Sequence, residues 1–185
     1  MVIGISGKSG SGKSTLANLI KDQYENAVVL HVDEVGHQVL TLPEIKEELV
    51  NQFGDSILDG DIVSRKALGD IVFANRHEMD KLTDITWKGM QVIIDEFLEV
   101  NKDKIVILDW LLLPHTRYFD ICDLKIMVDV PFEIRMERAI KRDGITEEKF
   151  RLRDSASIEL NRSDFDIVVE DVIKEDVRKL VRIYE

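Results

Sequence analysis

Short apolar runs that end in polar turns recur along the chain and predict the strands of one sheet. Five runs are expected to form strands: 1–6, 27–32, 104–109, 124–130 and 165–170. Those at 104–109 and 124–130 are apolar almost throughout, as is typical of parallel strands covered on both faces. Because helical patterns separate the runs, the sequence predicts an α/β protein with a parallel five-stranded sheet.

Apolar residues spaced three or four positions apart predict the helices. The first helix is expected to bury one face, made of Leu16, Leu19 and Ile20. A second is expected near Pro43, where Thr41 and Glu44 have the spacing of a capping box, and Ser64 is expected to cap a third. A long helix over 77–100 is expected to bury a stripe of Met79, Leu82, Ile85, Ile93 and Phe97.

The connection between the second and third strands is far longer than one crossover needs. Residues 33–101 are therefore expected to form a helical insertion beside the carboxyl ends of the strands, where ligands of open α/β sheets bind. The core of this single domain is expected to comprise 1–32 and 102–185. Its last helix is expected to start near Asp171 and to bury Ile173, Val177 and Leu180.

The stretch GKSGSGKST joins the first strand to the first helix and matches the pattern GxxxxGK[ST] at every fixed position. Glycines let backbone N–H groups turn inward around a phosphate, and the helix N-terminus adds a positive field. Lys13 can reach the β- and γ-phosphates, and the Ser14 hydroxyl can ligate Mg²⁺. A nucleoside triphosphate is expected to bind Gly7, Lys8, Ser9, Gly10, Ser11, Gly12, Lys13, Ser14 and Thr15.

Two carboxylates follow predicted strands at the edge where this loop is expected. Asp33 follows the second strand and can accept a proton from an attacking hydroxyl; the alternative is a helix N-cap. Asp109 ends the third strand and can order Mg²⁺, although aspartates are also common at loop starts.

Arginines gather after the fourth strand, in a predicted pair of helices that resembles a closing lid at about 138–156. Arg135, Arg138 and Arg142 fall on one helix face, and Arg151 and Arg153 lie in the second helix. Such a lid neutralises charge on a transferring phosphoryl group and excludes water. The alternative is a solvated helix pair, because acidic residues are interspersed.

The charge balance limits the partners. The 185 residues include 25 Lys and Arg against 36 Asp and Glu, a formal net charge of −11. This excess disfavours nonspecific nucleic-acid and membrane-surface binding, so local donors must hold any anionic ligand. With one cysteine, Cys122, no signal peptide and no membrane span, we expect a cytoplasmic protein; its oligomeric state stays open.

Four stretches together resemble the dephospho-coenzyme A kinases: ISGKSGSGKST, VDEVGHQVL, FGDSILDGDIVSRKALGDIVF and VDVPFEIRMERAIKRDGITEE. The resemblance implies a three-layer α/β/α P-loop fold, ATP and Mg²⁺ as cofactors, and transfer to the ribose 3'-hydroxyl of dephospho-coenzyme A. It further implies Asp33 as the base, Lys13 as the phosphate clamp, and Ser14 as the Mg²⁺ ligand. His37 and Arg65 would contact the acceptor held by the insertion, and Arg138 and Arg142 would be catalytic lid residues.

The chain departs from the family pattern mainly on the acceptor and adenine sides. His31-Val32-Asp33 keeps only the second acid of an Asp-x-Asp, Trp87-Lys88 stands for His-Pro, and His115 ends the segment that usually reads Pro-Leu-Leu-x-Glu. The lid lacks its usual Gln, and Asp171 stands for Asn. Two alternatives therefore stay open: a related nucleoside or nucleotide kinase, and an ATP-binding regulatory protein without catalysis. ATP is not distinguished from GTP.

Overall fold

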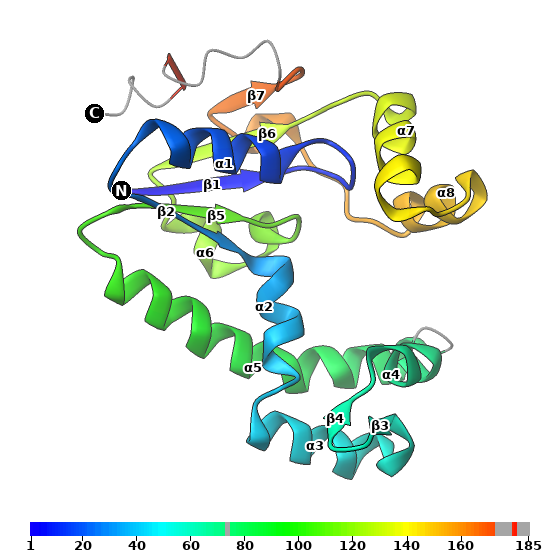
Figure 1. The fold of residues 1–185 in the computed structure, drawn as a ribbon. Coiled ribbons are helices and arrows are strands. Elements are labelled where there is room, and N and C mark those ends of the chain that lie inside the picture. The colour runs from blue at the N-terminus through cyan, green and yellow to red at the C-terminus, as the bar shows by residue number, and fades with distance from the viewer. Residues whose placement is uncertain (73–74, 173–178, 181–185) are drawn as a thin grey trace. The chain divides into compact units, whose positions relative to one another are not determined.

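A computed structural model describes residues 1–72, 75–172 and 179–180 (Figure 1). The chain divides into two compact units, one formed by 1–31 with 101–185 and the other by 32–100. Within the described ranges, no helix is both long and apolar enough to cross a membrane.

The first unit is built on five parallel strands in the order β2-β5-β1-β6-β7, which confirms the predicted fold class. The strands are β1 (Val2–Ser6), β2 (Ala27–His31), β5 (Ile105–Asp109), β6 (Leu124–Val128) and β7 (Ile167–Val169). The central strand β1 pairs Ile3 with Ile107 of β5 and with Leu124 of β6. The predicted runs at 124–130 and 165–170 were thus longer than the strands they form.

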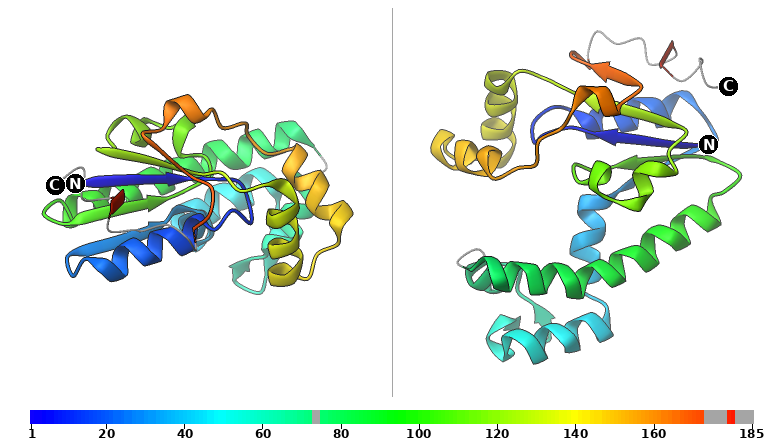
Figure 2. Two further views of the ribbon diagram at one scale, coloured as in Figure 1. Left: turned by 90° about the horizontal axis from the view of Figure 1, so that it is seen from above. Right: turned by 180° about the vertical axis from the view of Figure 1, so that it is seen from behind.

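Helices cover both faces of this sheet (Figures 1 and 2). On one face, α1 (Lys13–Gln23) buries Leu16, Ala17 and Ile20 in one cluster with Ile3 and Ile5 of β1. On the other face, a Cβ on Gly4 would lie 2.8 Å from Leu113 of η2 (Leu113–His115) and 2.7 Å from Cys122, which follows α6 (Arg117–Asp120). A side chain at Gly4 would therefore separate this layer from the sheet.

Three segments gather beyond the carboxyl ends of the strands. The loop after β1, residues 7–12, leads into α1, and α7 (Phe132–Asp143) and α8 (Glu147–Ser155) lie next to it (Figure 1). The chain then returns to β7 through the short helix η3 (Arg162–Asp164). Because all five strands are parallel, these connections meet at one edge of the sheet.

The second unit is helical. The helices α2 (Val32–Val39), α3 (Pro43–Phe53) and α4 (Arg65–Val72) each pack against the long helix α5 (Arg76–Val100). Between α3 and α4 lie η1 (Asp55–Ile57) and an antiparallel pair of short strands, β3 (Leu58–Asp59) and β4 (Ile62–Val63). At Gly89 of α5, an added Cβ would lie 3.1 Å from Val39 and 3.3 Å from Ile45, so glycine permits close helix packing.

Helix starts were predicted with mixed success. Ser64 caps α4, its Oγ accepting a hydrogen bond from the Ala67 N–H at 3.3 Å, as expected. The capping box before α3 was wrong, because Pro43 occupies the first turn and Leu42, which has no polar side chain, is the N-cap. The Thr41 hydroxyl instead donates to the backbone oxygen of Gln38.

Burial also differs from the predicted stripes. In α1, Leu16 and Ile20 are fully buried, but Leu19 is 37% exposed. In α5, Ile85 is buried as expected, whereas the other predicted positions are only half-buried and Ile94 is fully buried. Because three helices contact α5 along its length, its buried surface is not a single stripe. Of the last predicted helix, Ile173 and Val177 lie outside the described residues, and Leu180 is buried.

Candidate active site

The loop after β1 has a shape that requires glycine. Gly10 and Gly12 have φ values of +81° and +98°, which disfavour residues with a side chain. At Gly7 the constraint is space, because an added Cβ would lie 2.6 Å from both the Ser11 Oγ and the Val128 backbone oxygen. Gly12 is the N-cap of α1 and has no side chain to satisfy the first-turn N–H groups of that helix. These amides can therefore bind an anion.

Asp109, at the end of β5, links the loop lysine to a histidine that the sequence did not single out for function. Asp109 as a whole is 2% exposed. One oxygen, Oδ2, lies 2.7 Å from the His31 Nδ1, and the other, Oδ1, lies 4.0 Å from the Lys13 Nζ. Oδ1 has no hydrogen-bond partner among the described residues, and neither does the buried Ser11 hydroxyl. One of these unsatisfied oxygens lies in the loop and the other lies 4.0 Å from the lysine that follows it, which is a reason to expect a ligand here.

The site suits a cation that takes few ligands from the protein and most of its ligands from water and from the phosphates. Nowhere in the described part of the chain do three His, Cys, Asp or Glu side chains gather into a metal site. Mg²⁺ in phosphate-transferring enzymes is commonly bound by only one or two protein carboxylates together with the substrate phosphates. Asp109 and the half-buried Ser14, in the first turn of α1, match that requirement.

The three arginines of α7 diverge in the structure. Arg138 donates through Nη1 to the Ser11 backbone oxygen at 3.3 Å, and therefore reaches the loop. Arg135 is buried and donates to the Ser9 backbone oxygen, also at 3.3 Å. The Arg142 side chain is 63% exposed, and its hydrogen bonds go to the neighbouring Asp143. These bonds raise the pKa of the Arg142 guanidinium and lower the pKa of the Asp143 carboxyl. Arg142 is thus not brought to the loop.

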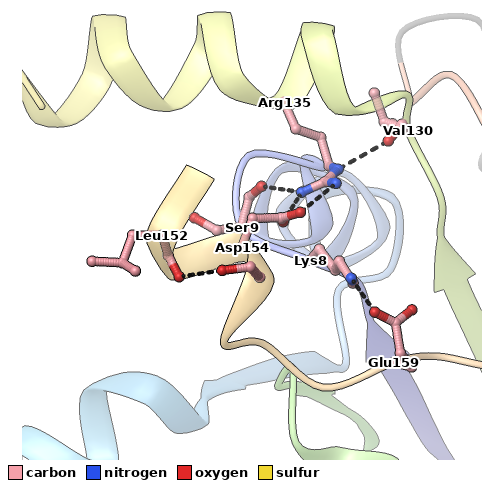
Figure 3. Close-up of polar contacts among 8 residues, drawn as sticks. Lys8, Ser9, Val130, Arg135, Leu152, Asp154 and Glu159 are labelled. Atoms are coloured by element: carbon pink, nitrogen blue, oxygen red, sulfur yellow. Dashed lines mark hydrogen bonds and ion pairs between the residues drawn. The ribbon is translucent and has the colours of Figure 1, made fainter. Parts of the chain in front are cut away.

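Lys8, predicted to bind the nucleotide, and Arg151 of the predicted lid both have protein contacts. Lys8, in the loop, forms a 3.1 Å ion pair with Glu159 (Figure 3). Arg151 pairs with Glu147 of its own helix and lies over the Phe132 ring, 4.9 Å from its centroid. The second lid helix thus has an ion pair within itself, a feature that the alternative of a solvated helix pair also predicts.

Within the second unit, a groove of about 760 Å³ brings together two residues expected to contact the acceptor. His37, in the last turn of α2, and Arg65, the first residue of α4, both line it. Lys46 of α3 lines the same groove and was missed by sequence reasoning. Its ammonium donates to the backbone oxygen of Asp61 at 2.6 Å and forms an ion pair with the carboxylate, which lowers the pKa of that carboxyl.

Asp33 lies in the first turn of α2 and is exposed. The strand before it ends at His31, so Asp33 belongs to the helix and not to the strand end that was predicted. Asp33 and His37 are separated by four positions, and residues at this spacing share one side of a helix. Asp33 thus shares a side of α2 with a residue of the groove.

The sequence model of the dephospho-CoA kinases matches residues 1–180. The chain belongs to this family. A dephospho-CoA kinase of Aquifex aeolicus is 33% identical over 190 residues, spanning 99% of this chain and 95% of that protein. TT1252 from Thermus thermophilus has a similar structure, with a TM-score of 0.81 at 26% identity and coverage of 99% of this chain and 93% of that chain. A dephospho-CoA kinase from Campylobacter jejuni, 20% identical, shares the fold with a TM-score of 0.68, covering 98% and 94%.

As a dephospho-CoA kinase family member, the chain is a phosphotransferase that uses ATP. His31 stands where the sequence resemblance predicts the first acid of an Asp-x-Asp pattern. The signal that could have revealed its role is its position, because His31 ends β2 directly beside Asp109 of β5 in the sheet register.

Proposed function

We propose that this protein phosphorylates the ribose 3'-hydroxyl of dephospho-coenzyme A with ATP, using the loop at 7–15 for the triphosphate and the groove of the second unit for the acceptor. The observation that carries the proposal is two buried oxygens without a hydrogen bond: the Ser11 hydroxyl in the glycine-built loop, and the Asp109 Oδ1, which lies 4.0 Å from the Lys13 ammonium. A dedicated ligand site, and not a linker, explains why the fold keeps them.

The triphosphate would be held by local donors in an otherwise acidic chain. The first-turn amides of α1, the Lys13 ammonium and the Arg138 guanidinium all come from the loop or reach it. In such sites catalysis is mainly positioning and charge stabilisation, because the transferred phosphoryl group carries the charge. Arg138 is a stronger candidate for this role than Arg142, since Arg142 is paired with Asp143.

Mg²⁺, when bound, would neutralise charge shared by the β- and γ-phosphates. The Ser14 hydroxyl and the Asp109 Oδ1 would hold it, directly or through water. The hydrogen bond from His31 to Oδ2 fixes the carboxylate and leaves Oδ1 for this task.

The chemistry of the groove supports an acceptor with anionic and apolar parts. His37 and Arg65 offer hydrogen-bond donors, and Lys46 adds an ammonium that is paired with Asp61 of the same groove. Leu40, Pro43, Ile62 and Val63 line the same groove and offer apolar surface. Dephospho-coenzyme A combines a pyrophosphate with a long, largely uncharged arm. A nucleoside, one of the two acceptor classes in the related-kinase alternative, has no anionic group for Arg65 to bind.

Asp33 is proposed as the general base. Its carboxylate would accept the proton of the 3'-hydroxyl while the oxygen bonds to the γ-phosphorus and ADP leaves. Its position on the side of α2 that carries His37 supports this role, as does its proximity in sequence to His31 at the end of β2. A cytoplasmic setting stays a prediction that rests on the single, buried Cys122.

The test is ADP release by purified protein with Mg-ATP, comparing dephospho-coenzyme A with nucleosides and nucleoside monophosphates. Lys13→Ala is the blank. We expect turnover with dephospho-coenzyme A, a fall of about 10²–10⁴-fold in kcat for Asp33→Asn with ATP binding retained, and near-normal kcat for the matched control Glu34→Gln. Turnover only with another acceptor would refute the substrate, and unchanged kcat in Asp33→Asn would refute the base.

A further inference from the structure

A buried ion pair joins the phosphate loop to the second lid helix. Arg135 of α7 is 7% exposed, and its Nη1 lies 2.6 Å from the Oδ1 of Asp154 in α8. The same guanidinium donates through Nη1 to the Ser9 backbone oxygen of the loop and through Nε to the Val130 backbone oxygen, at 3.3 and 3.0 Å (Figure 3). One side chain thus holds three segments together: the loop, the start of α7 and the end of α8.

The backbones of the loop and α7 also touch where this arginine begins. A Cβ added to Gly10 would lie 2.3 Å from the Arg135 backbone oxygen and 2.9 Å from its carbonyl carbon. With so little space, α7 cannot shift toward the loop without displacing Gly10. The position of α7 and the shape of the loop are therefore mechanically linked, independently of the side-chain bonds.

The charged groups of Arg135 and Asp154 are both largely buried. The Asp154 side chain is 14% exposed, and the two groups approach through a second contact, Nη2 to Oδ2, at 3.5 Å. A buried pair of this kind adds little net stability compared with apolar residues of similar size, but it fixes geometry, and removing one partner leaves an uncompensated charge. By contrast, the Lys8–Glu159 pair on the same loop has a Glu159 side chain that is 91% exposed, so water competes for it.

We propose that Arg135 and Asp154 form a clamp that keeps the phosphate loop in its nucleotide-binding shape while α8 is docked. Arg135 is a positioning residue: its guanidinium is occupied by Asp154 and by two backbone oxygens, one of which belongs to the loop. When α8 undocks, Arg135 loses its carboxylate, and its hold on the Ser9 oxygen weakens. Docking of the lid helix and triphosphate affinity are thereby coupled through Ser9.

The experiment is a double-mutant cycle on the full-length protein with Arg135→Met, Asp154→Leu and the double variant. Three quantities are measured: the dissociation constant of a non-hydrolysable ATP analogue with Mg²⁺, amide hydrogen exchange in the loop at 8–12, and the unfolding midpoint. The single variants should bind the analogue about tenfold more weakly, which corresponds to losing one charge-assisted hydrogen bond. Their loop amides should exchange faster.

The double variant separates coupling from simple stability. Replacing both charges with apolar groups should return the unfolding midpoint to about the wild-type value. Analogue affinity should stay about tenfold weaker, because no group then bonds the Ser9 oxygen. If the double variant recovers both stability and affinity, or if the single variants bind the analogue normally, the clamp is refuted.

Two further variants test whether the loss of analogue affinity is specific to the bond between Arg135 and Asp154. Asp154→Asn keeps a hydrogen-bond acceptor beside Arg135 and should lose less analogue affinity than Asp154→Leu; an equal loss would contradict a specific bond. Asp70→Asn breaks an exposed pair with Lys66 and should leave the dissociation constant unchanged. The proposal rests on ATP use alone, so it survives if the acceptor is not dephospho-coenzyme A.

Discussion

Substitution of Gly10 by alanine tests the link between the phosphate loop and α7 without changing any charge. Two costs add. A Cβ at φ +81° costs roughly 1–2 kcal/mol, and its 2.3 Å approach to the Arg135 backbone oxygen is about 1 Å too short for a carbon–oxygen contact. Relief of such overpacking costs about 1–3 kcal/mol. We therefore expect Gly10→Ala to lower the free energy of unfolding by about 3 kcal/mol.

Gly60→Ala is the matched control, because Gly60 also has a positive φ, +60°, but nothing lies within 4 Å of an added Cβ. It should cost only the backbone term, roughly 1 kcal/mol. Urea denaturation gives both values. Calorimetry with an ATP analogue should show at least tenfold weaker binding for Gly10→Ala and no change for Gly60→Ala. Equal destabilisation by the two substitutions, with unchanged ATP affinity in both, would refute the contact between Gly10 and α7.

Three further outcomes are expected. Leu16→Ala, at a fully buried position of α1, should destabilise by about 3 kcal/mol, whereas Leu19→Ala, at a position 37% exposed, should cost less than about 1 kcal/mol in the same denaturation experiment. Arg138→Ala should raise the KM for ATP far more than Arg142→Ala, since only Arg138 bonds the loop; steady-state kinetics would contradict this if the order were reversed. Burial raises the pKa of the Cys122 thiol from 9.0 to about 12, so above pH 9 the folded protein keeps a proton that the unfolded chain releases. The free energy of unfolding should therefore fall as the pH rises from 9 to 12. The fall should be less steep in Cys122→Ala, and denaturation at a series of pH values measures it.

The sheet and the loop could be predicted from the sequence because their determinants are local. Apolar runs define parallel strands, and the glycines and lysine of the loop occur within one short motif that follows a strand directly. The predicted α/β fold with five parallel strands was therefore confirmed, including the helix after the loop.

The contacts that organise the candidate site are not local, and the sequence did not reveal them. Arg135 meets a carboxylate 19 positions away, and His31 meets Asp109 across 78 positions. Helical periodicity put Arg135, Arg138 and Arg142 on one face of a helix, but in the structure Arg135 and Arg138 bond the loop backbone whereas Arg142 bonds Asp143. Periodicity fixes where a Cβ points, not where a long side chain ends, and the neighbouring Asp143 offers Arg142 a nearer partner.

His31 stands where the resemblance to the family leads one to expect an aspartate. A histidine at this position affects how an acidic protein can hold a polyanion such as the triphosphate of ATP. The Nδ1 of His31 lies 2.7 Å from the Asp109 carboxylate, and two carboxylates so close together could not both stay ionised. A histidine donates a hydrogen bond instead, and the other oxygen of Asp109 lies 4.0 Å from the Lys13 ammonium. The exchange therefore removes one negative charge from the end of the sheet that faces the loop while keeping the carboxylate that can bind a cation. With a net charge of −11, the protein needs such local arrangements to hold a polyphosphate, because charge interactions beyond a Debye length of about 8 Å are largely screened.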